Sequence, residues 1–253
     1  MSSNQNINIK EDFQNKSDTY FEANYVGNKN ADRLARQNLI SSVIKNAGIA
    51  NLKFLDAGAG PAVLGEIVKE NKGIYHASDL SIHNLISGQK RIGNFDACVA
   101  DNCSLPFKKE SFDVTACIGS VEYTPENKKA IAELFRVTKN GGTIILTVAN
   151  KNSPANWIND RLMMPIRKLK TTFAHKPFYK RYFISEGEFV NMAQKAGVTI
   201  KETYFIKSVL LGNQLNKFSF IKKFERFLFK NINTLNKAKM EILIVAQKNS
   251  NVQ

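Results

Sequence analysis

Short apolar runs alternate with amphipathic segments between residues 53 and 150 of the chain. The runs predict β-strands at residues 53–56, 74–79, 97–100, 113–118 and 143–149. Helical spacing predicts helices beginning near Val63 and covering about residues 126–137, and a turn at residues 140–142 precedes the fifth strand. Repeated strand–helix units with short connections indicate an α/β fold, with a doubly wound parallel sheet covered by helices on both faces.

The pattern changes on either side of this segment. Residues 1–31 are expected to form a lid or clamp, and its aromatic anchors are Phe13, Tyr20, Phe21 and Tyr25. A helix is predicted over residues 32–47, at the start of a core that covers residues 32–150. Residues 151–184 interrupt the alternation and are expected to form an insertion. From a capping box at Ser185 and Glu188, a helix, a strand over residues 198–206, a helix over residues 217–231 and a strand over residues 240–246 complete the same domain.

The turn after the first predicted strand reads Asp56-x-Gly58-x-Gly60 and carries the strongest chemical signal. Two glycines let the backbone turn sharply and approach a ligand closely. A pyrophosphate-binding loop would have a third glycine where Val63 stands, and Asp56 would repel the phosphates. The carboxylate suits a ligand with an ammonium group, such as the methionine part of S-adenosylmethionine. The alternative is a plain glycine turn between a strand and a helix.

Two further aspartates end the next two predicted strands. Asp79 follows Gly60 by the spacing at which a carboxylate accepts hydrogen bonds from ribose hydroxyls, although it could instead cap the helix that starts near Ser81. Asp101 could accept from an adenine amino group, or form an Asx turn toward Leu105. Because the carboxyl ends of parallel strands meet at one edge, we favour the ligand interpretation for both.

The ordered motifs resemble those of class I S-adenosylmethionine-dependent methyltransferases, and among them the group that includes the ubiquinone and menaquinone biosynthesis methyltransferases. They are Leu55-Asp56-x-Gly58-x-Gly60, Ser78-Asp79-Leu80-Ser81, Ala100-Asp101-Asn102, Leu105-Pro106-Phe107, Ser111-Phe112-Asp113-Val114 and Glu133-Leu134-Phe135-Arg136-Val137-x-Lys139-x-Gly141-Gly142. The resemblance covers about residues 35–150, and residues 182–201 more loosely. It implies a Rossmann-like methyltransferase fold of seven strands, mostly parallel, with an antiparallel last strand and a helical insertion after the fifth.

The resemblance also implies S-adenosyl-L-methionine as the cofactor and assigns its contacts. Gly58 and Gly60 would face the methionine moiety and Asp56 would order its ammonium group. The remaining expected contacts are Asp79 with the ribose, Leu80 against the adenine, Asp101 and Asn102 at the adenine edges, and Ile118 through its backbone. One departure is Ala62, where the family often has glycine, and we expect the added methyl group to be tolerated.

Methyl transfer from a sulfonium mainly requires alignment of the acceptor and exclusion of water, and an acceptor of high pKa also needs a base. Glu122 and Tyr123 follow the fourth predicted strand, where the acceptor pocket lies in this family. His83 and His175 are the other candidates. The sequence does not select a base among the four, and it leaves open whether oxygen, nitrogen or carbon is methylated.

Composition and charge limit the remaining choices. No run of about 18 apolar residues is present, so no membrane-spanning helix is expected. Cys98, Cys103 and Cys117 lack metal-ligand spacing, so we expect reduced thiols in a cytoplasmic protein without a metal. Residues 1–150 carry 17 Lys or Arg against 16 Asp or Glu, whereas residues 151–253 carry 19 against 6. This asymmetry predicts an anionic partner for the second half.

Two basic amphipathic segments, around residues 161–170 and 217–230, suit the inner face of an anionic membrane, or else pack their apolar sides on the sheet. Our leading hypothesis is therefore a methyltransferase for a small-molecule or lipid-linked acceptor, peripheral to a membrane. An RNA (tRNA) methyltransferase is the second interpretation, less favoured because no RNA-binding module is recognisable. A non-catalytic protein that binds S-adenosylmethionine is the third. The oligomeric state stays open.

Overall fold

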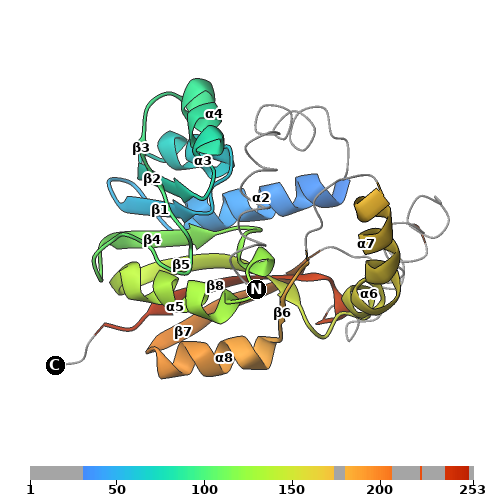
Figure 1. Ribbon diagram of the computed structural model, residues 1–253. Helices are drawn as coiled ribbons and strands as arrows, with labels where there is room; N and C mark the ends of the chain where they lie inside the picture. The colour runs from blue at the N-terminus through green and yellow to red at the C-terminus, as the bar shows by residue number, and fades with distance from the viewer. Residues whose placement is uncertain (1–30, 174–179, 207–222, 224–236, 251–253) are drawn as a thin grey trace.

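One mixed sheet organises the computed structural model, which describes residues 31–173, 180–206, 223 and 237–250. Its strands lie in the order β3-β2-β1-β4-β5-β8-β7, and β6 pairs with β5 off this path (Figure 1). The strands are β1 (Lys53–Ala57), β2 (Ile74–Asp79), β3 (Asp96–Val99), β4 (Phe112–Cys117), β5 (Thr138–Asn150), β6 (Phe183–Ile184), β7 (Val198–Ile206) and β8 (Glu241–Lys248). Only β8 runs antiparallel to its neighbours β5 and β7 among these strands, so the predicted α/β class and antiparallel last strand are confirmed.

Three predicted features of the strands need correction. The sheet has eight strands rather than seven, because Phe183–Ile184 pairs with the end of β5 and is too short to leave a periodic pattern. The fifth strand begins at Thr138 rather than at residue 143: the glycine pair lies inside it as a bulge, where the register jumps between Phe112 and Val114. The third and fourth strands each start and end one residue earlier than predicted, and the last strand covers Glu241–Lys248 rather than residues 240–246.

Helices cover both faces of the sheet, as the doubly wound prediction requires. On one face, α5 (Asn127–Val137) and α8 (Glu186–Lys195) pack through Ile131, Leu134 and Phe189 on alternate residues of β5 and β8. On the other face, α2 (Ala31–Asn46), α3 (Val63–Glu70) and α4 (Ile82–Ile92) pack through Ile44, Val68 and Leu85. Successive strand residues point to opposite faces, so apolar residues of these central strands fill both cores.

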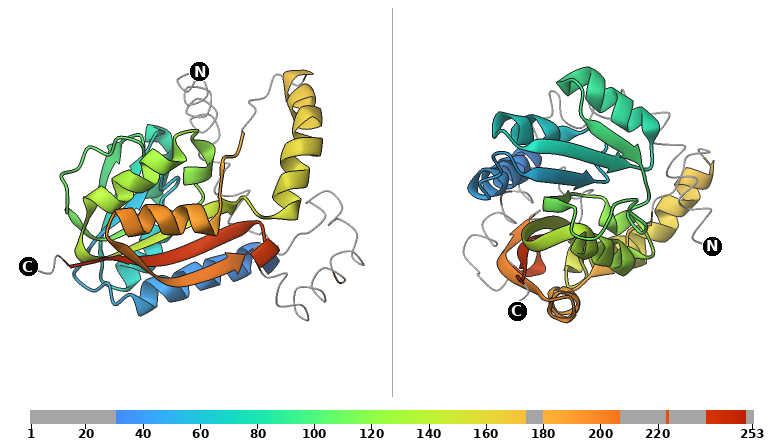
Figure 2. Two further views of the ribbon diagram at one scale, coloured as in Figure 1. Left: turned by 90° about the horizontal axis from the view of Figure 1, so that it is seen from below. Right: turned by 90° about the vertical axis from the view of Figure 1, so that its left-hand side faces the viewer.

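The insertion after β5 is helical, as predicted, and consists of α6 (Pro154–Ile158), the π-helical turn η2 (Asn159–Met163) and α7 (Met164–Phe173). Its base is fixed to the sheet because the Asn156 amide donates to the carbonyl oxygens of Asn150 and Met240, at 2.8 and 2.7 Å. Beyond this base, α6 and α7 stand apart from the helices that cover the sheet (Figures 1 and 2). The predicted segment 1–31, apart from Ala31, and most of the predicted helix over residues 217–231 lie outside the described residues.

Candidate functional site

Three aspartates lie along one edge of the sheet, where neighbouring strands β1, β2 and β3 end. Asp56 is near the end of β1, Asp79 ends β2 and Asp101 follows β3. The glycine turn is held against this edge, because the amides of Gly58 and Ala59 both donate to the carbonyl oxygen of Ser78, at 2.7 and 2.9 Å. The sheet order therefore brings together polar residues that the sequence separates.

The close packing around Gly58 explains why the turn needs a glycine. Its φ of +70° lies in the left-handed region, and a Cβ there would come within 2.2 Å of Ser120 Oγ and 2.9 Å of Asn102 Nδ2. These two side chains come from the loops after β4 and β3, and Asn102 donates to Ser120 across 3.0 Å. Asn102 Oδ1 is buried without a partner in the structure. Three loops thus converge on the glycine, and Ser120 and Asn102 occupy the space that a side chain at residue 58 would need.

Ala62 also adopts a left-handed conformation, with φ of 56°. Glycine is the residue that takes this conformation without steric cost, which accounts for its frequent use at this position. The methyl group of Ala62 is fully buried and belongs to the core beside α4. Arg91 of α4 donates to its carbonyl oxygen at 2.8 Å. The departure at residue 62 is therefore a matter of local backbone strain and core packing.

Asp56 is 2% exposed and accepts a hydrogen bond from the hydroxyl group of Tyr75 at 2.7 Å. Burial raises the pKa of this carboxyl group to about 7, against the opposing effect of the tyrosine hydrogen bond. A carboxylate that is poorly solvated in this way has a strong tendency to acquire a cationic partner. A cationic ligand group would therefore stabilise the charged form of Asp56.

Asp79 organises the glycine turn through both of its oxygens. Oδ2 accepts from the Gly60 amide at 2.8 Å, and Oδ1 accepts from the Ser81 amide at 2.9 Å and the Asn84 side chain at 3.1 Å. Burial raises the pKa of Asp79, and the hydrogen bonds from Ser81 and Gly60 oppose it. Ser81 itself caps α4. The helix-capping alternative is therefore partly realised, while the carboxylate retains lone pairs for a further donor.

The loop after β3 contains the Asx turn that was the alternative interpretation of Asp101. Asp101 Oδ1 accepts from the Cys103 amide at 2.8 Å. The following residues are clamped from α5, where Glu133 accepts from the Leu105 amide and Arg136 donates to the carbonyl oxygens of Leu105 and Phe107. The motifs containing these residues thus fix the loop that carries Asn102.

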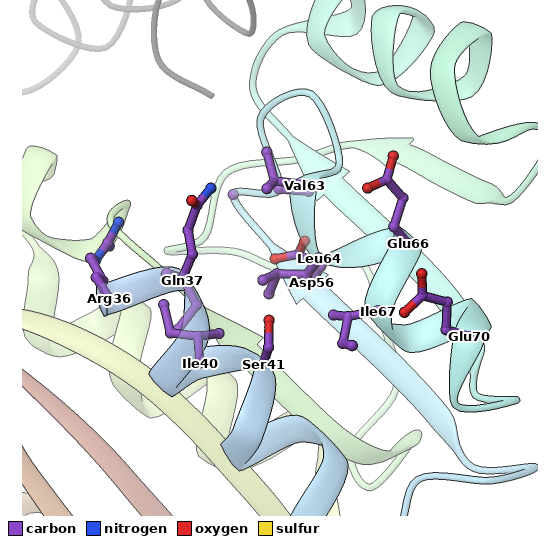
Figure 3. Close-up of a pocket in the computed structure, with 13 residues that line it drawn as sticks. Arg36, Gln37, Ile40, Ser41, Asp56, Val63, Leu64, Glu66, Ile67 and Glu70 are labelled. Carbon is purple, nitrogen blue, oxygen red and sulfur yellow. The ribbon is translucent and has the colours of Figure 1, made fainter. Parts of the chain in front are cut away.

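A cavity of about 290 Å³ opens beside the glycine turn, between α2 and α3 (Figure 3). Its lining includes Asp56, Gly58 and Ile118 of the predicted site, together with Arg36 of α2. Arg36 is ion-paired with the buried Glu241 at 2.8 Å. An acidic and a basic side chain at one cavity fit the ammonium and carboxylate groups of an amino acid, and therefore the methionine end of S-adenosylmethionine.

Arg36 is the residue that sequence reasoning missed. It lies one helical turn before Ile40, a buried core residue, so a cation occupies the inward side of an otherwise ordinary helix. A cation at this inward-facing position was the signal in the sequence that could have identified Arg36. Leu80, the last of the predicted contacts, is half-buried beyond the end of β2.

Two of the four candidate bases lie together. Glu122 and Tyr123 share the short turn η1 (Val121–Tyr123) after β4, and Glu122 is 4% exposed with Arg181 at 3.4 Å. Burial, then the adjacent Glu122 charge, raises the pKa of Tyr123. His83 is exposed on the first turn of α4, and His175 lies outside the described residues.

Burial also raises the pKa of Cys98, Cys103 and Cys117, which keeps these three thiols protonated near neutral pH. Among the described residues, no group of three or more His, Cys, Asp or Glu side chains could hold a metal ion.

Comparisons with known proteins agree on one family. A model described as a methyltransferase domain matches residues 55–146. A ubiquinone biosynthesis O-methyltransferase from Pseudomonas fluorescens is 26% identical over 171 residues, which are 64% of this chain and 71% of that protein. A demethylmenaquinone methyltransferase from Renibacterium salmoninarum is 33% identical over 94 residues, 37% of this chain and 40% of that protein.

The crystal structure of a magnesium protoporphyrin IX methyltransferase from Synechocystis, with SAH bound, superposes with a TM-score of 0.65. The match covers 97% of this chain and 100% of that chain at 15% identity, so it bears on the fold alone. The matched methyltransferase domain and these relatives, together with the ordered motifs, support a class I S-adenosylmethionine-dependent methyltransferase, with S-adenosyl-L-methionine as its methyl donor.

Proposed function

We propose that S-adenosyl-L-methionine lies along the edge formed by the loops after β3, β2, β1 and β4. Gly58 and Gly60 face its methionine end, with Asp56 at the ammonium group and Arg36 at the carboxylate group. Asp79 accepts from the ribose, Leu80 contacts the adenine, Asp101 and Asn102 bind its polar edges, and Ile118 lines the cofactor. The buried charge of Asp56, the Arg36 beside the same cavity and the unpartnered Asn102 Oδ1 support these roles.

The methyl acceptor in this proposal is a small molecule, and one that is itself lipid-linked or held at a membrane. The cofactor supplies a methyl group already activated by its positive sulfur, so the protein has to orient the acceptor and exclude water. Two relatives are named for ubiquinone biosynthesis and for demethylmenaquinone methylation, which supports this acceptor class. The exposed face of the insertion is the observation that carries the membrane part.

That face consists of four large apolar side chains on α6, η2 and α7. Trp157, Leu162, Ile166 and Leu169 are 59%, 58%, 48% and 60% exposed. Leu162, Ile166 and Leu169 are spaced by four and three residues, which places them on one side of a helix. Trp157 precedes Leu162 by five residues, and the intervening π-helical turn brings such a pair onto the same side. We call this set the apolar stripe.

Charge supports an anionic surface as the partner of the apolar stripe. Arg161 and Lys168 are exposed beside it on the same insertion, and residues 151–253 carry 19 Lys or Arg against 6 Asp or Glu. Exposed apolar groups with flanking cations are typical of segments that lie in the interface of an anionic bilayer. No helix among the described residues is long and apolar enough to cross a bilayer.

Vesicle co-sedimentation tests the membrane part. The wild-type chain should bind vesicles that contain phosphatidylglycerol, less so as salt rises, and should not bind neutral vesicles. The triple variant Leu162→Gln, Ile166→Gln and Leu169→Gln should lose most of this binding. As a control, Ile82→Gln with Ile86→Gln removes two exposed apolar residues, 47% and 42% exposed, from α4 and should leave binding unchanged.

An RNA acceptor is the second candidate, favoured by the same excess of positive charge. The two candidates differ in the role of the apolar stripe. If the triple variant binds vesicles as the wild type does, while the wild type binds tRNA with a steep salt dependence, the membrane proposal is wrong and the RNA proposal is preferred.

A further inference from the structure

Two largely buried ion pairs lie near Tyr123, at the carboxyl edge of the sheet. Arg36 and Glu241 form a close pair, with both Nε and Nη2 of the arginine within 3.0 Å of Glu241 Oε1. Glu122 and Arg181 form a looser pair, with one contact of 3.4 Å between Nη2 and Oε1. Burying charges costs solvation energy, which a single long contact offsets poorly. The looser pair therefore lacks a full structural explanation.

The atoms of this pair that lack a hydrogen-bond partner indicate what kind of ligand group would fit between them. Glu122 Oε2, a hydrogen-bond acceptor, and Arg181 Nε, a donor, are both buried without a partner in the structure. A group that satisfies both atoms must donate one hydrogen bond and accept another. A hydroxyl group does this, whereas a carbonyl group only accepts and an ammonium group only donates.

The surroundings of Glu122 connect it to the cofactor edge. It lies two residues after Ser120, whose Oγ is part of the packing around Gly58. The carbonyl oxygen of Glu122 accepts from the Tyr182 amide at 2.7 Å. The residues after Tyr182 form β6, which pairs with the end of β5. Arg181 is thus held at the point where the insertion returns to the sheet. The pair joins the cofactor half of the chain to the insertion.

We propose that Glu122 and Arg181 bind the reacting hydroxyl group of the acceptor, and that the chain is an O-methyltransferase. This inference rests on the proposed small-molecule acceptor. The hydroxyl oxygen gives its proton to Glu122 Oε2 and forms a bond with the methyl carbon. The electrons of the broken carbon–sulfur bond remain on sulfur, so S-adenosylhomocysteine leaves. Arg181 Nε donates to the oxygen and stabilises the negative charge that develops on it.

Product analysis is the first test. The full chain is incubated with methyl-labelled S-adenosylmethionine and a total small-molecule extract, and the labelled products are identified by mass spectrometry and NMR. A methyl ether supports the inference. A methyl ester, or a label on carbon or nitrogen, overturns it but leaves the proposed function standing. No labelled product from the wild-type chain overturns both.

Variants assayed on the demethylated form of that product provide the second test. Glu122→Gln should lower kcat by roughly 100- to 10,000-fold, the range of a lost general base. Glu122→Asp should recover part of the rate, and Arg181→Gln should raise KM and lower kcat. Affinity for S-adenosylhomocysteine, measured by calorimetry, should stay within about twofold in all three, because the cofactor contacts remain.

Lys180→Gln is the matched control, since it removes a charge from the same segment, beside Tyr182 rather than Glu122. It should retain the wild-type rate. Equal rates for Glu122→Gln and Lys180→Gln, with both variants folded and binding S-adenosylhomocysteine, would overturn the inference.

Discussion

The cofactor half of the molecule, residues 31–150, and the insertion differ in how their exposed apolar side chains are distributed. Residues 31–150 expose four large apolar side chains, but these are scattered over β2, α4 and β3. The insertion also exposes four, and all of them lie within one continuous helical segment. Polar groups at the cofactor edge are bound largely by the chain's own amides, as at Asp79. The cofactor half therefore exposes no continuous apolar surface among its described residues, whereas the insertion exposes one that suits a binding partner.

This difference teaches where each part of the specificity resides. The donor site depends on the loops after four neighbouring strands, which pack around the glycine turn. The acceptor side depends on segments that meet only in the folded sheet, such as Glu122 after β4 and Arg181 before β6. Substitutions in one region should therefore leave the function of the other intact. A variant that affects both functions would contradict this independence.

The largest effect is expected from Gly58→Val. The new side chain would collide with Ser120 and Asn102 and would force a branched residue into a left-handed conformation. Affinity for S-adenosylhomocysteine should fall roughly 100-fold or more, which is about 3 kcal/mol of binding free energy. Gly60→Ala is the milder comparison, because Gly60 also has a positive φ, of +54°, but a Cβ there would meet no protein atom within 4 Å. Calorimetry should show a much smaller loss there, and vesicle binding should persist in both variants.

Asp56 gives the next largest effect and a pH dependence of known sign. Its pKa of about 7 means that the carboxyl group is mostly neutral below pH 7 and charged above it. Affinity for S-adenosylmethionine should therefore rise between about pH 6 and pH 8 and then level off. Asp56→Asn should bind weakly with no such rise. A wild-type affinity that is constant over this range would contradict the role of the aspartate.

Glu133→Ala should lower stability and cofactor affinity together. The glutamate accepts from the Leu105 amide and holds Arg136, so its removal releases the loop that carries Asn102. We expect the free energy of unfolding to fall by about 2 kcal/mol in urea titrations. Lys129→Ala, exposed on the same helix, should change it by less than about 0.5 kcal/mol. Unchanged affinity in a destabilised Glu133 variant would separate the loop from the cofactor site.

Ser185→Ala should have the smallest effect, because Ser185 lies after the insertion and outside the cofactor half. Ser185 and Glu188 form a reciprocal capping box at the start of α8. Loss of the cap should cost about 1 kcal/mol of unfolding free energy, and Ser185→Asp should restore most of it. Cofactor affinity should not change in either variant. A matching loss of affinity would show that the two halves are coupled more strongly than the contacts indicate.

The strands of the donor side could be predicted because their signals are local. Strands Ile74–Asp79 and Val198–Ile206 have the predicted bounds, since buried apolar runs bounded by polar residues leave a clear pattern. The extended β5 was missed because its glycines, read as a turn, form a bulge within the strand. Arg36 was missed because one cation on an amphipathic helix looks like a solvated residue until the fold turns it toward the cavity.

The acceptor side could not be predicted in the same way. Neither Glu122 nor Arg181 belongs to a motif that implies the other, and they are 59 residues apart in the sequence. Their contact results from the way β6 returns to the end of β5. The apolar stripe was partly visible as an amphipathic segment, but whether it packed on the sheet or faced outward depended on where the insertion stands.

The central claim is that S-adenosylmethionine binds at the glycine turn, independently of the insertion. Its most direct test is calorimetric titration of S-adenosylhomocysteine into three full-length proteins: the wild type, Gly58→Val, and the triple variant of the apolar stripe. We predict one binding site per chain in the wild type, the same affinity in the triple variant and binding that is roughly 100-fold weaker or more in Gly58→Val. Absence of binding to the wild type, or equal binding to Gly58→Val, would contradict the account.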